Sequence, residues 1–506
     1  MVLTLGMAYL SAVSGSVFGA ILLLLSYRAF FHPLAQYPGP RLASITGLWR
    51  LWHYIIGDWS EIILELHKRY GKIVRLAPNE LSVVDESAMK ALFGHNTTAL
   101  KTKWYSAFQS PRGAPNILAT QDTKVHAAIR RRFAPAFKMT VLLRQEDSMQ
   151  KYLDELWMSL QKPASDGTII DMCHYTETVT WDIIGQLCFG QPLGAIVGPD
   201  ALDLANILNK LLKMSTVLGH VWGQIAWVDN PLTRFIGMKN PIQDSFEWAS
   251  RVVQQHEEAD RSSVEPDTVD YFLHWRDAQG KPATHLEVVE GAFAVTGAGA
   301  DTVAIAMRAA LYHLNTNPAV LQKLREEIDV LDAKGPLSYK QTQQLSYLKA
   351  VVRESLRMYS SVPAQLYRIV PSGGLSIDDR FIPSDTVVGI SSLAQNRDPI
   401  FGLDANIFNP DRWLGDESKA RYFEAALFNF GGTGIRSCPG RDLAMIELYK
   451  FVAQMVQKFD FELVDQAHPW SVKTYFFAIH SDMRMRVAHR KRSVGVHNES
   501  TDDLVQ

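Results

Sequence analysis

The chain has 506 residues, of which 47% are hydrophobic, so it can form one large domain or several average ones with a sizeable core. Lysine and arginine together number 51 and aspartate and glutamate 53; a net charge of −2 argues against bulk electrostatic binding of nucleic acid. The three cysteines, Cys173, Cys188 and Cys438, are too few for a disulfide framework and favour a reducing compartment.

The N-terminal segment, residues 1–27, carries no charged side chain and contains the apolar run FGAILLLLSY. Because about 20 apolar residues cross a bilayer as a helix, we predict a transmembrane anchor here. Arg28 and Arg41 follow the run, and positive charge in this position places the rest of the chain on the cytoplasmic side. A cleaved secretory signal is the alternative, which the lack of positive charge before the run disfavours.

The remainder of the chain predicts a mainly α fold with a small β portion. Residues 28–42 include three prolines, which block helix formation and predict a stiff elbow. Residues 43–490 form one domain, in which KIVRLAPNELSVV predicts two strands joined by a turn at Pro78-Asn79. Residues from about 125 to 359 have helical periodicity, and short strands return afterwards. The polar tail, residues 491–506, is predicted to be disordered.

One cysteine stands at an unusual turn. In FNFGGTGIRSCPGRDLAMIEL, Cys438 lies between a glycine-rich loop and the start of an amphipathic helix, where a thiolate is stabilised by the helix dipole and free N–H groups. Structural zinc needs four ligands, and no second cysteine or histidine accompanies this one. A catalytic cysteine needs a histidine base, which the sequence does not identify. A single thiolate that holds a metal from one side indicates haem.

The loop GTGIRSCPG resembles the haem loop of the cytochrome P-450 superfamily, Phe-x-x-Gly-x-Arg-x-Cys-x-Gly. Four other stretches resemble motifs of that family, in the family's order: HAAIRRRF, AGADT, ESLR and FNPDRW. The match runs from the proline elbow to about Val487 and implies the cytochrome P-450 fold, preceded by one N-terminal transmembrane helix. The start of the chain and NRDPIFGLDANIFNPDRWL look most like fungal members of secondary metabolism, including those similar to pisatin demethylase.

The haem loop departs from the family pattern at one position. Seven residues before the cysteine the family has Phe, whereas this chain has Gly431, with Phe430 one step earlier. Either the loop is one residue longer and Phe430 reaches the same place, or the loop is less shielded. Since packing and hydrogen bonds around the sulfur tune a haem potential, this departure bears on the potential and leaves the ligation unchanged.

The resemblance implies roles for individual residues. Cys438 is implied to be the proximal thiolate ligand of the haem iron. Other implied cofactor contacts, the first four of them to propionates, are His126, Arg130, Arg368, Arg436, Gly434, Gly440, Ala298 and Gly299. Glu354, Arg357 and Arg412 are implied to form a buried cluster that supports the haem loop, although the first two alone would suggest an ordinary surface ion pair. Arg131 and Arg132 are candidates for a basic face that binds an acidic reductase.

The stretch TGAGADT lies inside a long apolar helical pattern. Gly297 and Gly299 suggest a phosphate loop, but no strand precedes them, so we predict instead a local break in the helix hydrogen bonding at Gly299. The resemblance implies that Thr302 hydrogen-bonds oxygen and that Asp301 relays protons from solvent. The alternative for Asp301 is a structural salt bridge.

Substrate contacts are expected, by analogy, from mostly apolar segments, including residues 201–240. The candidate contact residues are Trp104, Phe108, Phe293, Val362, Gln365 and Phe476. Their character predicts a lipophilic substrate in a closed pocket, and core packing is the alternative for several of them.

The resemblance implies a haem-thiolate monooxygenase that inserts one atom of dioxygen into a lipophilic secondary-metabolite intermediate by hydroxylation, epoxidation or oxidative demethylation. Its cofactor would be haem (heme b, iron protoporphyrin IX). Electrons would come from NADPH through a separate NADPH–cytochrome reductase, with a cytochrome b-type donor as a second candidate, because no flavin domain fits in the length. The expected location is the endoplasmic reticulum membrane, crossed once, with the catalytic domain in the cytoplasm.

Two other functions stay open at the level of sequence. One is a haem-thiolate isomerase or dehydratase that acts on a peroxide without a reductase. The other is a non-catalytic haem sensor or carrier. The pair Asp301-Thr302 argues against the first, and the pair together with an apolar pocket argues against the second.

Overall fold

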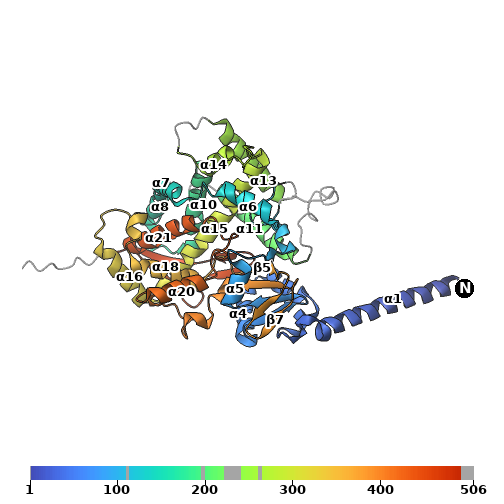
Figure 1. The fold of residues 1–506 in the computed structure, drawn as a ribbon. Helices are drawn as coiled ribbons and strands as arrows, with labels where there is room; N and C mark the ends of the chain where they lie inside the picture. The colour runs from blue at the N-terminus through green and yellow to red at the C-terminus, as the bar shows by residue number, and fades with distance from the viewer. Residues whose placement is uncertain (1, 110–112, 195–199, 222–240, 260–264, 492–506) are drawn as a thin grey trace, which may run out of the picture.

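The computed structural model describes residues 2–109, 113–194, 200–221, 241–259 and 265–491 (Figure 1). The predicted disordered tail, apart from Lys491, lies outside these residues, as does the stretch 222–240 of the predicted substrate segment. Figure 1 shows a helical body with strands gathered at one side of it, near α4 (Trp59–Tyr70) and α5 (Glu86–Phe93). The prediction of a mainly α fold with a small β portion is confirmed.

The helices make up most of the structure. Besides α4 and α5, the α-helices are α1 Val2–Ser26, α2 Arg41–Ile45, α3 Leu48–Ile56, α6 Thr123–Phe133, α7 Met139–Arg144, α8 Glu146–Ser159, α9 Gln161–Asp166, α10 Met172–Phe189, α11 Asp200–Gly219, α13 Pro241–Glu258, α14 Thr268–His274, α15 His285–Thr316, α16 Pro318–Val330, α17 Tyr339–Thr342, α18 Ser346–Met358, α19 Ser392–Gln395, α20 Glu417–Ala426 and α21 Arg441–Lys458. The shorter helical turns are η1 Tyr27–Phe31, η2 Pro33–Gln36, η3 Lys103–Phe108, η5 Pro399–Phe401 and η6 Pro410–Trp413.

The strands are short and form four small sheets. They are β1 Ile73–Ala77, β2 Glu80–Val83, β3 Leu100–Lys101, β4 Ile170–Asp171, β5 Gln365–Ile369, β6 Leu375–Ile377, β7 Arg380–Ile382, β8 Val387–Ser391, β9 Phe459–Leu463, β10 Ser471–Thr474, β11 Ala478–Ser481 and β12 Arg484–His489. The largest sheet has the order β1-β2-β8-β5-β3, in which only β2 and β8 run parallel. The strands and turn predicted around Pro78-Asn79 are confirmed as β1 and β2.

Helix α15 runs through the centre of the helical body. It packs against α10, α13, α18 and α21, and its small residues allow a close approach: a Cβ at Gly299 would lie 2.6 Å from Ile184 Cδ1 on α10. The helix is continuous from His285 to Thr316, so the predicted break at Gly299 is wrong. Gly299 allows α15 to pack closely against α10, and α15 remains a regular helix where it borders the cavity described below.

Among the described residues, two helices are long and apolar enough to cross a membrane. One is α15, which is mostly buried inside the molecule and is therefore a core helix. The other, Ala12–Phe31, has none of its surface buried, and Figure 1 shows α1 extending away from the body. The latter is compatible with the predicted anchor and equally with a signal sequence.

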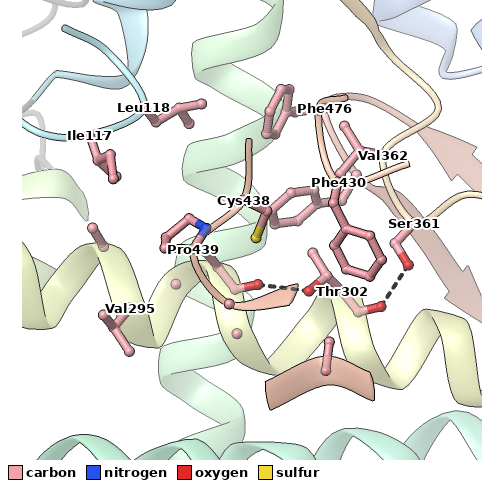
Figure 2. A pocket seen from close by; sticks show the side chains of 18 of the residues that line it. Ile117, Leu118, Val295, Thr302, Ser361, Val362, Phe430, Cys438, Pro439 and Phe476 are labelled. Atoms are coloured by element: carbon pink, nitrogen blue, oxygen red, sulfur yellow. Dashed lines mark hydrogen bonds between the residues drawn. The ribbon is translucent and has the colours of Figure 1, made fainter. Parts of the chain in front are cut away.

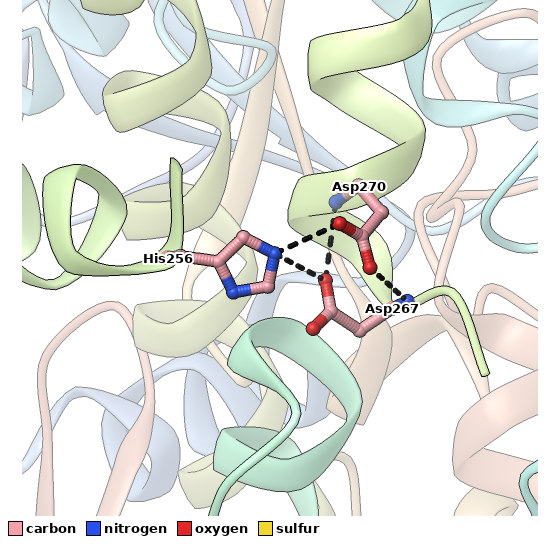
Figure 3. A group of neighbouring side chains, drawn as sticks. All are labelled: His256, Asp267 and Asp270. Carbon is pink, nitrogen blue, oxygen red and sulfur yellow. Dashed lines mark hydrogen bonds and ion pairs between the residues drawn. The ribbon is translucent and has the colours of Figure 1, made fainter. Parts of the chain in front are cut away.

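A buried histidine joins α13 to α14 (Figure 3). His256 Nε2 lies 3.0 Å from Asp270 Oδ1 and 3.4 Å from Asp267 Oδ1. The same two carboxylates form a capping box, in which each accepts the backbone N–H of the other residue. Although the three side chains are close enough to hold a metal ion, their atoms already serve these bonds. We therefore assign the cluster a structural role at the start of α14.

Candidate active site

The glycine-rich loop before α21 presents Cys438 to the interior. The backbone N–H of Cys438 donates to the carbonyl of Phe430 at 2.7 Å, which closes the loop on itself, and Gly440 caps α21. Gly434 is required by a close approach, because a Cβ there would lie 2.3 Å from the carbonyl oxygen of Phe93. The predicted loop-then-helix arrangement around the cysteine is confirmed.

The thiol of Cys438 lies deep in the molecule, and its accessible surface faces a cavity (Figure 2). Burial raises the pKa of this thiol, while the backbone N–H of Gly440 and the guanidinium of Arg130 act in the opposite direction. An ionised sulfur here therefore needs a further positive partner, and a metal ion supplies one.

The cavity has a volume of about 410 Å³ and is lined mainly by apolar side chains. Cys438 and Gly440 line one wall, and Ala298, Gly299 and Thr302 of α15 line another. Figure 2 shows Cys438, Thr302 and Phe476 around the same space. The chain thus brings the cysteine loop and the central helix, more than 130 residues apart in sequence, to opposite parts of one cavity.

Thr302 is held in a defined orientation. Its hydroxyl donates to the carbonyl of Ala298 at 2.9 Å, and its own carbonyl accepts from the hydroxyl of Ser361 at 2.6 Å. The side chain is half-buried and borders the cavity. The hydroxyl can turn from the helix carbonyl toward a bound group, because its hydrogen position is free to rotate.

Asp301 lies elsewhere than expected. It is 6% exposed, does not line the cavity, and faces α10, where Trp181 and Glu177 are its neighbours. Burial, and then the charge of Glu177, raise the pKa of Asp301 to about 7, although Arg308 opposes this. Neither carboxyl oxygen has a hydrogen-bond partner in the described part of the chain. Asp301 therefore lies at the interface between α15 and α10 and not in the cavity wall; the ion pair at this interface joins Arg308 to Glu177.

Basic side chains gather at one edge of the cavity, and we call Lys101, His126, Arg130, Arg368 and Arg436 the cation cluster. Of these, Lys101, His126 and Arg436 line the cavity itself. Burial and the neighbouring cations lower the pKa of His126 to about 3 and that of Arg436 to about 10. Because like charges crowd together here, the cluster is suited to an anionic group at this edge.

Sequence analysis missed Lys101. It is 5% exposed, donates to the carbonyls of Ile117 and Leu118, and is the register partner of Arg368 across β3 and β5. Burial, and then the charges of Arg368 and Arg436, lower the pKa of Lys101 well below its ordinary value. The sequence offered little signal, because Lys101 and Lys103 both precede a predicted substrate segment and nothing in the sequence separates the buried lysine from the exposed one.

The other two arginines of the cation cluster do not line the cavity. Arg130 donates to the carbonyl of Ser437 at 2.5 Å and to its hydroxyl at 3.2 Å, so it holds the residue next to Cys438. Arg368 lies over the ring of Phe93, donates to Tyr105, and has an unpartnered Nε. Both stand behind the side chains that line the edge.

Arg132 was expected on a basic docking face, and that expectation is wrong. It is 5% exposed, and its guanidinium pairs with Glu287 at 2.5 Å. Arg131, the next residue on α6, is exposed. Only Arg131 of this pair can therefore contribute to a surface.

The predicted structural cluster is present and buried. Arg357 donates to both carboxyl oxygens of Glu354 at 2.7 and 2.8 Å, and Arg412 donates to the same carboxylate at 3.3 Å. Trp413 adds an indole N–H at 2.8 Å. Arg357, Arg412 and Trp413 thus direct four N–H groups to one carboxylate, which offsets the cost of burying its charge.

Asn396 connects this cluster to the cysteine loop. Arg357 donates to its carbonyl at 2.7 Å, while its side chain accepts from the backbone N–H of Phe428 at 2.8 Å and donates to Asn429 at 2.8 Å. Asn396 is fully buried, and sequence reasoning did not single it out. The cluster therefore fixes the start of the loop that carries Cys438.

Phe430 occupies a strained backbone position. Its φ is +53°, a left-handed value unusual for a residue with a Cβ, and Gly431 and Gly432 follow with φ of +75° and +83°. The Phe430 side chain lines the cavity near Cys438 (Figure 2). The sequence left two possibilities for Gly431 in place of the family's Phe: either the loop is one residue longer and Phe430 reaches the same place, or the loop is less shielded. The position of the Phe430 side chain agrees with the first possibility.

Four of the six candidate substrate residues line the cavity: Phe108, Phe293, Val362 and Phe476. Two do not, and those two expectations are wrong. Trp104 packs beside the cavity against Phe108 and Phe476, with its indole N–H toward the carbonyl of Thr216. Gln365 directs its amide to Ser82 in the sheet.

The residues present fit a haem. A thiol and a helix with small residues face one apolar cavity, and a flat group between them would meet glycine and alanine on α15. Crowded cations at the edge match two carboxylates. The fold and this site together define a haem-thiolate protein.

Comparison with known proteins agrees. The family model "Cytochrome P450" matches residues 38–481. A pisatin demethylase of Fusarium vanettenii is 30% identical over 463 residues, covering 90% of this chain and 89% of its own. A cytochrome P450 monooxygenase of Aspergillus terreus is 32% identical, with coverage of 87% and 92%, and one of Penicillium aethiopicum, gsfF, is 29% identical, with coverage of 95% and 98%.

The chain belongs to the cytochrome P450 family. It is an oxidoreductase of the monooxygenase kind, it is similar to fungal enzymes, and haem is the cofactor that its family implies.

Proposed function

We propose that this enzyme inserts one atom of dioxygen into a lipophilic secondary metabolite, by hydroxylation, epoxidation or oxidative demethylation. The observation that carries the proposal is the placement of Cys438 and Thr302 on the walls of one apolar cavity. A bound haem would supply the oxygen-activating chemistry, and Cys438 would hold it through its thiolate. The apolar lining favours a substrate with few charges and excludes water from it.

Within this proposal the chain's own residues divide the remaining tasks. Thr302 holds a proton near the reacting oxygen, because its hydroxyl borders the cavity on α15. Lys101, His126 and Arg436 hold the carboxylates of the cofactor, and Arg130 holds the cysteine loop through Ser437. For Asp301 the proposed role is a relay of protons toward Thr302, the next residue on α15; because Asp301 faces α10, such a relay would not run through the cavity wall.

The electrons are proposed to come from NADPH through a separate reductase, with a cytochrome b-type donor as a second source. A docking surface near the cysteine loop would include exposed Arg131 on α6 and Arg441 at the start of α21. Positive groups here would attract an acidic partner.

The enzyme is proposed to sit on the cytoplasmic face of the endoplasmic reticulum membrane, anchored by α1. Apolar side chains just after the anchor support this: Phe30 and Phe31 are each 75% exposed, Leu48 is 65% and Trp52 is 59% exposed. They lie on η1 and α3, and α2 packs against both of these elements. A surface of this kind is stable against the interface of a bilayer.

The proposal is tested with the purified, haem-loaded chain. We expect the reduced carbon-monoxide complex to show the thiolate-type absorption band, and Cys438→Ser to abolish it, while Cys173→Ala keeps it. Reductase, NADPH and dioxygen should then support turnover of a lipophilic metabolite. Conversion of a peroxide without any electron donor, and none with the reductase system, would instead establish the isomerase or dehydratase function.

A further inference from the structure

Glu290 is an acid in the wall of an otherwise apolar cavity. It lies on α15, is 3% exposed, and lines the same cavity as Phe108 and Phe293. Burial raises the pKa of its carboxyl to about 7. None of the tasks assigned above to the cavity residues uses it.

One oxygen of Glu290 is fixed by Asn116. The amide of Asn116 donates to the carbonyl of Phe108 at 2.9 Å and to Glu290 Oε1 at 3.0 Å, while its oxygen accepts from the backbone N–H of Ala119 at 2.7 Å. These backbone partners determine which end of the amide is the donor, so Oε1 must be an acceptor. Every hydrogen-bonding atom of the Asn116 side chain is occupied.

The other oxygen, Oε2, is buried and has no hydrogen-bond partner in the described part of the chain. Burial raises the pKa of Glu290, and the hydrogen bond from Asn116 acts in the opposite direction; among the described residues no cation contributes. Arg132 of α6 is paired with Glu287, one turn earlier on α15. A carboxyl that is buried without a counter-charge and keeps a free oxygen is costly to the protein alone.

We propose that Glu290 binds a protonated amine of an otherwise apolar substrate. This rests on the proposed function, since it concerns the substrate of the same site. A protonated amine offsets the cost of the unpartnered oxygen and the cost of the buried charge. It supplies a hydrogen-bond donor to Oε2 and a charge opposite to that of the carboxylate. A neutral hydroxyl would supply the donor alone. The surrounding apolar walls would hold the remainder of the molecule.

The position of Glu290 also limits where the substrate is oxidised. Glu290 and Thr302 are 12 residues apart on one continuous helix, about 18 Å at 1.5 Å per residue. A substrate held at Glu290 therefore presents to Thr302 a carbon far from its nitrogen. We expect an extended or polycyclic amine, oxidised at the end remote from the nitrogen.

The test compares two ligands of matched shape. One is a long-chain N,N-diisopropyl amine, whose bulk prevents its nitrogen from ligating iron, and the other has CH in place of the nitrogen. Binding to the haem-loaded protein is measured by equilibrium dialysis, for the unchanged chain, for Glu290→Gln and for Ser215→Ala. Ser215 is the control because it also lines the cavity but carries no charge.

We expect the unchanged chain and Ser215→Ala to bind the amine at least tenfold more tightly than the carbon isostere, as a charge-assisted bond implies. Glu290→Gln should lose this preference and keep its affinity for the isostere. Equal binding of both ligands by the unchanged chain, or a preference that persists in Glu290→Gln, overturns the proposal. Neither result affects the carbon-monoxide spectrum, so failure here is distinct from failure of the monooxygenase function.

Discussion

Lys101 on β3 is the register partner of Arg368 on β5, so two cationic side chains occupy neighbouring places on one face of the sheet. Both are buried, at 5% and 3% exposure, and such a pair is unfavourable without an anion. The arrangement is understandable if the cofactor's carboxylates complete it. A bound haem would then stabilise the folded protein, because its carboxylates would offset the repulsion between Lys101 and Arg368.

Replacing Lys101 with Met should weaken haem retention and not the fold. We expect haem transfer to excess apomyoglobin to become roughly tenfold faster, the effect of losing one charge-assisted bond. Lys103→Met, which removes an exposed lysine two residues away, should leave the transfer rate unchanged. An unaltered rate in Lys101→Met would show that the lysine does not contact the cofactor.

Arg357→Lys should destabilise the protein, because a lysine cannot bind both oxygens of Glu354 and also reach the carbonyls of Asn396 and Ala405. A loss on the order of 3 kcal/mol is expected, with lower haem content, since the cluster supports the cysteine loop. Thermal unfolding followed at the haem band measures it. The control is Arg353→Lys, one turn earlier on α18, whose exposed pair with Glu424 contributes little; equal losses would contradict the argument.

Thr302→Ala should uncouple the reaction: reductant is still consumed, but product per NADPH falls several-fold and peroxide rises. The reason is that the hydroxyl holding a proton beside the cavity is gone. Thr296→Ala is a matched control, because Thr296 also donates to the carbonyl four residues earlier on α15 but is buried away from the cavity. Full coupling in Thr302→Ala would refute the role given to the hydroxyl.

Asp301 gives the enzyme a predictable response to pH. Its pKa is raised from 3.8 to about 7, so the folded state holds this proton more strongly than the unfolded state. Its contribution to stability is therefore full below pH 4 and falls as the pH rises toward 7. Asp301→Asn should raise the melting temperature more at pH 8 than at pH 5, by the equivalent of on the order of 2 kcal/mol. Exposed Asp379→Asn should show no such difference.

The exposed apolar residues after α1 predict a membrane contact in addition to the proposed anchor. A chain without residues 2–26 should still sediment with phospholipid vesicles, because Phe30, Phe31 and Trp52 remain. Replacing these three by serine in the shortened chain should release it into the supernatant. Serine at Val330, which is 84% exposed on α16, should not. Complete solubility of the shortened chain would restrict membrane binding to α1.

Local sequence was sufficient for the features whose chemistry is local. Cys438 before an amphipathic helix and the glycines around it can be interpreted within about 20 residues, because capping and close backbone approach act over that range. Glu354 and Arg357 share a helix face for the same reason. The fold class and family followed from these motifs and their order.

Only the tertiary structure decided which way other side chains point. Asp301 and Thr302 are adjacent in sequence, yet one faces α10 and the other the cavity, because neighbours on a helix differ by about 100°. Lys101 and Arg368 meet through strand pairing across 267 residues of chain, and Asn396 joins two motifs that sequence treats separately. Glu290 became informative only when the structure placed it in the cavity wall beside Asn116, since burial and partners are properties of packing and not of sequence.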